Sequence, residues 1–305
     1  MPAIFPIFRQ KKVKSYKTIN SIIDMIQGLG TYSIEAGLIY LNSLLRSSIL
    51  YAAETYYNLT EHNLRLLESI EENCIRRILD TEAKCPIYML YLSTGHLPAR
   101  FHIQKMMLNF LLYILNQNQN SLLFKFFEAQ CKNPTKNDWV SAIKKILLKL
   151  NIDLSFEEIK CIKIKEFSCQ VDENVRKLAF SYLLNKVKSK GKEIKFGKFL
   201  TCQNYLMPNK ILSLDEQRSI FKYQARMNKI SDNFKHHKYI ENCICGGYLD
   251  NSHLFECSVL NDGKSLNISY SQIFNGSLNE QKYIVNILDK NMEKLEEYTQ
   301  AWEVS

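Results

Sequence analysis

Hydrophobic residues recur at helical spacing along most of the chain. From residue 33 to 57 the apolar positions follow one another mostly at steps of three and four, which is the period of one face of an α-helix. The same spacing places Leu64 to Leu79 on one apolar stripe, with glutamates beside it. Further helical patterns cover 122–129, 138–150, 171–187, 215–229 and 278–297. We therefore predict a mainly α fold, a helical array with short connections.

Capping residues and prolines predict where several of these helices begin. Thr60 is a favourable N-cap for the helix that contains Leu64. Pro86 and Pro98 suit the first turns of two further helices, and Gly95 suits the end of the first of them. Ser155 and Glu158 have the spacing of a capping box, which predicts another short helix. A few short strands are expected around residues 246–247, where two glycines adjoin.

Composition is that of a globular protein. The 305 residues are 46% hydrophobic and 11% aromatic, enough for one large or two modest domains. No apolar run approaches the roughly 20 residues that span a bilayer, so we expect no membrane partner. The first residues lack a charged leader and a cleavage site, and the nine cysteines are an odd number. We expect reduced thiols and an intracellular location, cytoplasmic or nuclear.

Positive charge is concentrated in one stretch. Residues 132–240 hold 23 Lys and Arg against 11 Asp and Glu, whereas residues 241–305 hold 4 against 10. A strongly basic stretch is typical of proteins that contact nucleic acid. The alternative is a solvated, lysine-rich surface, and composition does not separate the two.

Four residues form a compact cluster of metal-ligand types. Cys243, Cys245, His253 and Cys257 follow one another as Cys-x-Cys, seven residues, His, three residues, Cys. Thiolates and an imidazole are the ligands of tetrahedral zinc, and residues four apart leave a helix on one face. We predict a zinc knuckle. The alternative is three buried thiols and a surface histidine. A catalytic zinc keeps one position open, so four ligands argue against a hydrolase.

Several motifs together resemble the C-terminal part of non-LTR (LINE-type) retrotransposon reverse transcriptases. The elements that match the family are Tyr-x-x-Glu at 51–54, paired arginines before Ile and Leu at 76–79, Thr-Gly-x-Leu-Pro at 94–98, Gln-Ala-Arg-Met at 224–227 and the cysteine-histidine cluster at 243–257. Their order and spacing agree with the family over roughly residues 30–290. Each motif is loose, and the ordered combination is more specific.

The resemblance implies a thumb-like helical region followed by a knuckle, without the catalytic parts. The family's polymerase palm has an Asp-Asp motif that holds two metal ions, and this sequence contains no Asp-Asp pair. We therefore expect no catalysis and no small-molecule substrate. The chain would be a truncated copy or a reused remnant, with template RNA or target DNA as its partner. The alternative is an inactive, degenerate fragment, or a protein-interaction remnant, that binds no nucleic acid.

On this interpretation, basic and aromatic side chains would contact phosphates and bases. The predicted nucleic-acid-binding residues are Arg76, Arg77, Lys144, Lys145, Lys186, Lys188, Lys190, Lys192, Lys195, Lys198, Arg226, Tyr223, Phe234 and Tyr248. Each has a plainer alternative, since arginines at a helix end favour its dipole and single aromatics are more often core.

The predicted organisation follows the chain in order. It consists of a segment of unknown role at 1–32, a thumb-like helical region at 33–130, a basic helical region at 131–240, the zinc-knuckle element at 241–260 and an acidic helical tail at 261–305.

Overall fold

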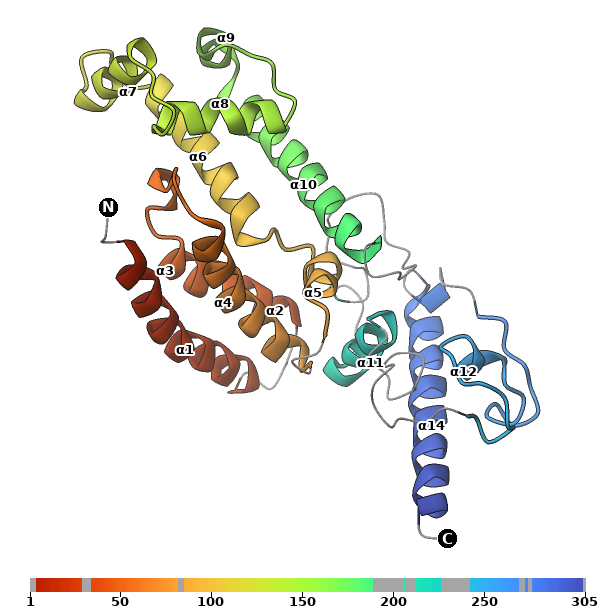
Figure 1. The fold of residues 1–305 in the computed structure, drawn as a ribbon. Helices are drawn as coiled ribbons and strands as arrows, with labels where there is room; N and C mark the ends of the chain where they lie inside the picture. Colours follow the sequence, from red (N-terminus) through yellow and green to blue (C-terminus); the bar gives the residue numbers. More distant parts are fainter. Residues whose placement is uncertain are drawn as a thin grey trace. The chain divides into compact units, whose positions relative to one another are not determined.

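The structure is a computed structural model that describes residues 4–28, 34–81, 85–188, 206, 212–225, 242–268, 272–273 and 276–303. Over these residues helices dominate, and the predicted mainly α fold is confirmed (Figure 1). The elements are α1 (Ile4–Gly28), α2 (Ile34–Tyr40), the π turn η1 (Leu41–Arg46), α3 (Ser47–Ile49), the 3-10 turn η2 (Ala53–Thr55), α4 (Glu61–Leu79), α5 (Ile87–Thr94), α6 (Ala99–Leu115), α7 (Leu122–Lys132), α8 (Trp139–Lys149), α9 (Phe156–Cys161), α10 (Ile164–Lys188), α11 (Leu214–Gln224), α12 (His253–Glu256) and α14 (Leu278–Glu303).

The predicted helix starts lie where the capping residues placed them. The backbone N–H of Asn63 donates to the Thr60 hydroxyl over 3.3 Å, so Thr60 caps α4. Pro98 is the residue that precedes α6, and Gly95 follows α5 with a positive φ of 68°. The capping box at Ser155 is complete and begins α9. Local side-chain chemistry thus sets these boundaries.

The single long helix predicted for 33–57 is wrong in its second half. Helix α2 passes into the π turn η1, α3 ends at Ile49, and Ala52 takes a left-handed conformation with a φ of 59°. A left-handed residue cannot continue an α-helix. The expected strands near residues 246–247 are also wrong, because β pairing among the described residues is limited to one bridge between Asn242 and Tyr248.

Contacts divide the chain into two compact units. The first comprises Met1–Met25, Leu38–Ile75 and Gly95–Thr201, and the second comprises Ile26–Gly37, Arg76–Thr94 and Cys202–Ser305. Each unit therefore combines segments from several of the predicted ranges.

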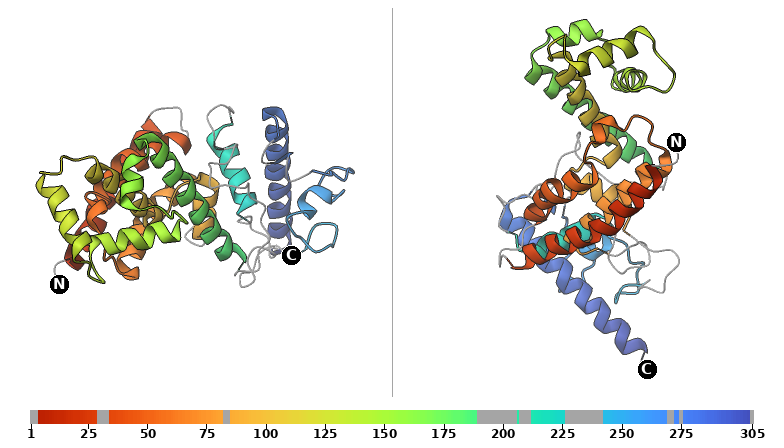
Figure 2. Two further views of the ribbon diagram at one scale, coloured as in Figure 1. Left: turned by 90° about the horizontal axis from the view of Figure 1, so that it is seen from above. Right: turned by 90° about the vertical axis from the view of Figure 1, so that its left-hand side faces the viewer.

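In the first unit, α6 packs lengthwise beside α10 (yellow and green in Figures 1 and 2). The Phe101 ring meets the Tyr182 ring edge-on at 5.5 Å, and the Arg100 guanidinium lies over that tyrosine at 5.3 Å from its centre. The buried residues of α10 form one row along the helix, which consists of Phe167, Val171 and every fourth residue after them up to Val187. The resulting apolar seam fixes the two helices against each other.

A second core cluster of the first unit is aromatic. The Trp139 ring packs edge-on against Phe110 at 5.7 Å and against Phe127 at 6.5 Å, and Phe127 packs against Phe156 at 5.3 Å. The indole N–H of Trp139 donates to the Glu54 carbonyl over 2.8 Å. These contacts join α6, α7, α8 and α9 and bind the η2 turn to them.

A buried arginine is the last residue of the π turn η1. Arg46 is 6% exposed, and its Nε donates to Oε1 of Glu71 over 2.7 Å, while Glu71 is fully buried. The guanidinium also donates to the side-chain oxygen of Asn42 over 3.1 Å and to the Leu97 carbonyl. The same Asn42 oxygen lies 3.1 Å from Nε2 of His96. A charge buried this deeply requires such a set of partners.

The second unit packs α11 and α12 against α14. Ser219 on α11 donates its hydroxyl to Asp289 on α14 over 2.9 Å. The buried Ser93 hydroxyl of α5 donates to the side-chain oxygen of Gln224 over 3.1 Å, which ties α5 to α11. The acidic helical tail predicted at 261–305 thus forms the support for α12 through α14.

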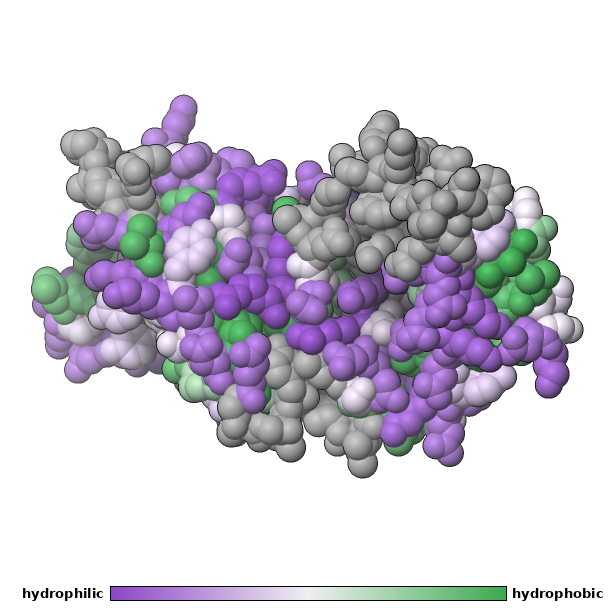
Figure 3. All heavy atoms as spheres, turned by 90° about the horizontal axis from the view of Figure 1, so that it is seen from below, coloured by the Kyte–Doolittle hydropathy of each residue, from purple (hydrophilic) through white to green (hydrophobic). Residues whose placement is uncertain are grey.

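One face of the molecule is mostly polar (Figure 3). On the face shown in Figure 3, hydrophilic residues predominate and hydrophobic residues form small separate groups. Within the described residues, none of the helices combines the length and the hydrophobicity needed to cross a membrane.

We expect the substitution Glu71→Gln to lower the free energy of unfolding by about 3 kcal/mol, because it leaves the Arg46 charge buried without its counter-ion. Urea-induced unfolding measures this loss. The matched control is Glu128→Gln, which removes an exposed partner of Lys132 and should change stability by less than about 0.5 kcal/mol. Equal effects of the two variants would contradict the importance of the buried pair.

Stability should also fall as the pH drops from about 6.5 toward 4. Burial lowers the pKa of His96 well below its usual value and lowers that of His102 to about 4, with the nearby Arg46 charge adding to both shifts. Between pH 6.5, the usual pKa of histidine, and pH 4, the histidines of the unfolded chain bind protons that those of the folded chain do not. Acid therefore favours unfolding. Urea unfolding at several pH values tests this. His102→Gln should flatten the curve, and an unaltered pH dependence in that variant would contradict the role of the buried histidine.

Candidate metal centre

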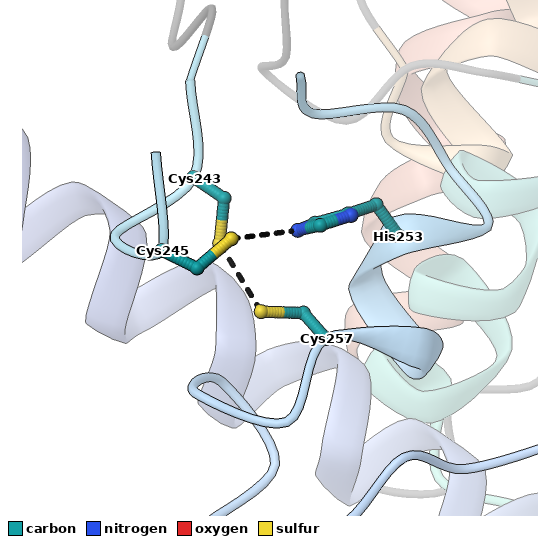
Figure 4. Close-up of side chains that lie close together, drawn as sticks. All are labelled: Cys243, Cys245, His253 and Cys257. Carbon is teal, nitrogen blue, oxygen red and sulfur yellow. Dashed lines mark hydrogen bonds between the residues drawn. The ribbon is translucent and has the colours of Figure 1, made fainter. Parts of the chain in front are cut away.

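Four predicted ligands converge at one point of the second unit. The ligand atoms of Cys243, Cys245, His253 and Cys257 all lie within 4.8 Å of one another, and they point toward a common centre in Figure 4. The Cys243 and Cys257 sulfurs are 3.5 Å apart, and the Cys245 sulfur is 3.3 Å from Nε2 of His253. The four side chains can therefore hold a single metal ion.

A tight turn supplies the first two ligands. The Cys243 N–H donates to the Gly247 carbonyl over 2.8 Å, and the Gly246 N–H donates to the Cys243 carbonyl over 2.8 Å. Gly246 has a φ of 82°, a conformation that side chains disfavour. A Cβ on Gly247 would lie 3.3 Å from both the Cys245 sulfur and a ring carbon of His253. Two glycines thus let the chain turn within the short Cys-x-Cys spacing.

The backbone around this turn favours a thiolate at Cys245. A hydrogen bond from the Gly247 N–H, 3.4 Å from the sulfur, is the main cause that lowers the pKa of Cys245 to about 7, and the nearby His253 ring adds to it. Burial acts in the opposite direction on Cys243, whose pKa rises to about 12. A cation at the centre would stabilise both sulfurs as thiolates.

The short helix α12 supplies the other two ligands. Asp250 caps its start, because one carboxylate oxygen accepts from the His253 N–H over 2.7 Å and from the Ser252 hydroxyl over 2.8 Å. The Cys257 N–H donates to the His253 carbonyl over 3.0 Å, so the two ligands lie one turn apart. The predicted one-face arrangement of His253 and Cys257 is thereby realised.

Two asparagines that sequence reasoning missed anchor α12 on α14. The amide of Asn261 donates to the carbonyls of Leu254, Phe255 and Cys257 over 2.8 to 3.3 Å. Asn291 is 1% exposed and donates to the Leu254 carbonyl over 2.7 Å and to the Asn261 oxygen over 2.9 Å. One signal was present, since Asn291 is a polar residue within the buried stripe of α14.

The aromatic candidates near the centre differ in exposure. Tyr248 follows the turn, pairs with Asn242 and is 60% exposed. Tyr223 is 7% exposed, its ring packs edge-on against Phe255 at 5.4 Å, and its hydroxyl donates to the Asn251 carbonyl over 3.3 Å. The predicted stacking of Tyr223 on a base does not fit this burial, because the ring supports α12 from within.

The basic candidates that the structure describes are spread over several helices. Arg76 and Arg77 occupy the last turn of α4, where cations favour the helix dipole. Lys144 and Lys145 are exposed on α8, and Lys186 and Lys188 are exposed at the end of α10. The predicted residues Lys190, Lys192, Lys195, Lys198, Arg226 and Phe234 lie outside the described residues.

Two acidic residues near the ligands, Asp250 and Glu256, have positions that local structure explains. Asp250 accepts the hydrogen bonds that cap α12, and Glu256 is exposed on the same helix. With three cysteine sulfurs and an imidazole converging, the donors already match the four positions of a tetrahedral ion. The arrangement suits a structural rather than a catalytic metal.

Comparison of the chain with protein-family models, with curated proteins and with solved structures found no match in any of the three. The resemblance to retrotransposon reverse transcriptases therefore stays a prediction from the motifs.

Proposed function

We propose that the chain is a nucleic-acid-binding protein whose knuckle at 242–257 is folded around one zinc ion. The convergence of Cys243, Cys245, His253 and Cys257 within 4.8 Å carries this proposal. With zinc–sulfur bonds of about 2.3 Å and zinc–nitrogen bonds of about 2.0 Å, tetrahedral geometry sets sulfurs about 3.8 Å apart and sulfur and nitrogen about 3.5 Å apart. The corresponding distances of 3.5 Å and 3.3 Å lie near these values, and all four ligand atoms lie within 4.8 Å of one another.

Softness of the donors also favours zinc. Three sulfurs and one imidazole exclude the oxygen-loving Ca²⁺ and Mg²⁺ as natural occupants, and a closed tetrahedron of this kind is typical of structural zinc. The zinc would supply the charge that holds the thiolates together. The chain's own residues would then orient the turn and its exposed Tyr248 toward a ligand.

Nucleic acid is the partner that the rest of the chain favours. The net charge is +9, and the exposed lysines at 144, 145, 186 and 188 lie in the basic stretch. An exposed tyrosine beside a metal-bound turn offers a stacking surface for an unpaired base. Together with the ordered motifs, these features support the C-terminal part of a non-LTR reverse transcriptase, binding RNA or DNA inside the cell, in the cytoplasm or the nucleus, without polymerase chemistry of its own.

Purified protein should contain about one zinc ion per chain, and a chelator should lower its thermal midpoint, because binding energy of a structural zinc is folding energy. Elemental analysis and thermal unfolding measure both. Cys257→Ser should lose the metal, whereas Cys161→Ser, an exposed thiol outside the cluster, should keep it. Metal-free protein under reducing conditions would refute the zinc proposal.

Affinity for oligonucleotides should fall steeply with salt, because each neutralised phosphate of a single strand contributes a slope of about −0.7 in log affinity against log salt. Fluorescence anisotropy at 50 to 300 mM salt measures the slope. The double variant Lys144→Gln with Lys145→Gln should flatten it.

The matched control for this experiment is Lys132→Gln with Lys290→Gln. It removes the same charge from two exposed lysines that already pair with Glu128 and Asp262. A flat salt dependence of the unsubstituted protein would contradict phosphate binding.

A further inference from the structure

A groove runs between α6 and α10 in the first unit. It consists of a cavity of 810 Å³ and a cavity of 300 Å³ that share Ile164 and Ser168. Lys105, Asn109 and Tyr113 line it from α6 at steps of four residues, and α10 lines it with Ile164 and every fourth residue from there to Arg176. The helices are antiparallel, so the two ladders face each other along one continuous groove.

One end of the groove is cationic. Asp172 accepts a hydrogen bond from the Lys105 ammonium and another from Nε of Arg176, at 2.9 Å for the arginine, so two cations share one carboxylate. Lys165 is a third cation in the lining. The remaining acid there, Glu173, already pairs with Lys177 at 2.6 Å. The net charge of the side chains at this end is positive, which favours an anionic group of a ligand.

The other end is aromatic and carries amides. Tyr113 is 55% exposed although it is large, and its ring lies parallel to the Phe110 ring at 6.0 Å, with 13° between the planes. Asn109, Asn116 and Gln117 border it, and Ile164 is also 55% exposed. Amide groups offer both donors and acceptors, as a nucleobase edge requires.

We propose that this groove binds a single-stranded segment of nucleic acid, with phosphates near Lys105, Lys165 and Arg176 and an unpaired base stacked on Tyr113. From Lys105 to Tyr113 is eight residues, about 12 Å along the helix, which is enough for about three stacked nucleotides. The inference rests on the proposed function and places its main contact away from the knuckle, on residues that the sequence had not indicated.

Binding of a fluorescent twelve-nucleotide oligo(U) to the full chain tests the groove. Tyr113→Leu should weaken binding about ten-fold, and Tyr113→Phe should retain it, because a phenyl ring also stacks. Lys165→Gln should reduce the salt slope by about 0.7. The controls are Tyr51→Leu, another exposed tyrosine of the same unit outside the groove, and Lys132→Gln, an exposed lysine of α7 outside it.

A second measurement uses the wild-type protein, so its outcome does not depend on whether a variant folds. Irradiation of the wild-type protein with the same RNA carrying 5-iodouracil should cross-link the peptide that contains Tyr113. Wild-type affinity of Tyr113→Leu and Lys165→Gln, with cross-links confined to the knuckle, would overturn the groove and leave the proposed function in place. If the wild-type chain binds no oligonucleotide, both fall.

Discussion

The first unit depends on the seam between α6 and α10. Its apolar positions recur every fourth residue on α10, so the two helices stay in register over several turns. The same register aligns the polar positions that flank the seam, which is how Lys105 meets Asp172 and how Tyr113 comes to lie near Ile164. The same four-residue spacing therefore determines both the packing of α6 on α10 and the lining of the candidate binding groove. A substitution that shifted the seam would alter both.

The knuckle is under a different constraint, because it has little core of its own. Between residues 242 and 257 it contains one bridge and one helix of four residues, and its buried apolar side chains besides the cysteines, Leu249, Leu254 and Phe255, are few. So small an element needs a further source of stability, such as a metal. Hydrogen bonds from Asn261 and Asn291 to α12 carbonyls supply orientation, and a bound ion would supply the remaining free energy.

Local signals explain which features the sequence predicted. Thr60, Ser155 and Pro98 act within one helical turn, and the structure places helix starts at each of them. The spacing of His253 and Cys257 is equally local, so four ligands could be named without a fold. The π turn could not be predicted from the sequence, because Arg46 contacts Glu71 and Leu97 only through tertiary packing. Tyr223 was misjudged for the same reason, since its cover comes from Phe255, 32 residues further along the chain.

The two candidate contacts differ in what they can recognise. The knuckle presents a single exposed tyrosine on a rigid turn, which can stack on any base and reads little sequence. The groove adds amides beside a second tyrosine, and these can distinguish base edges. On the proposed function, the groove would decide which strands are preferred, and the knuckle would add a contact that reads little sequence.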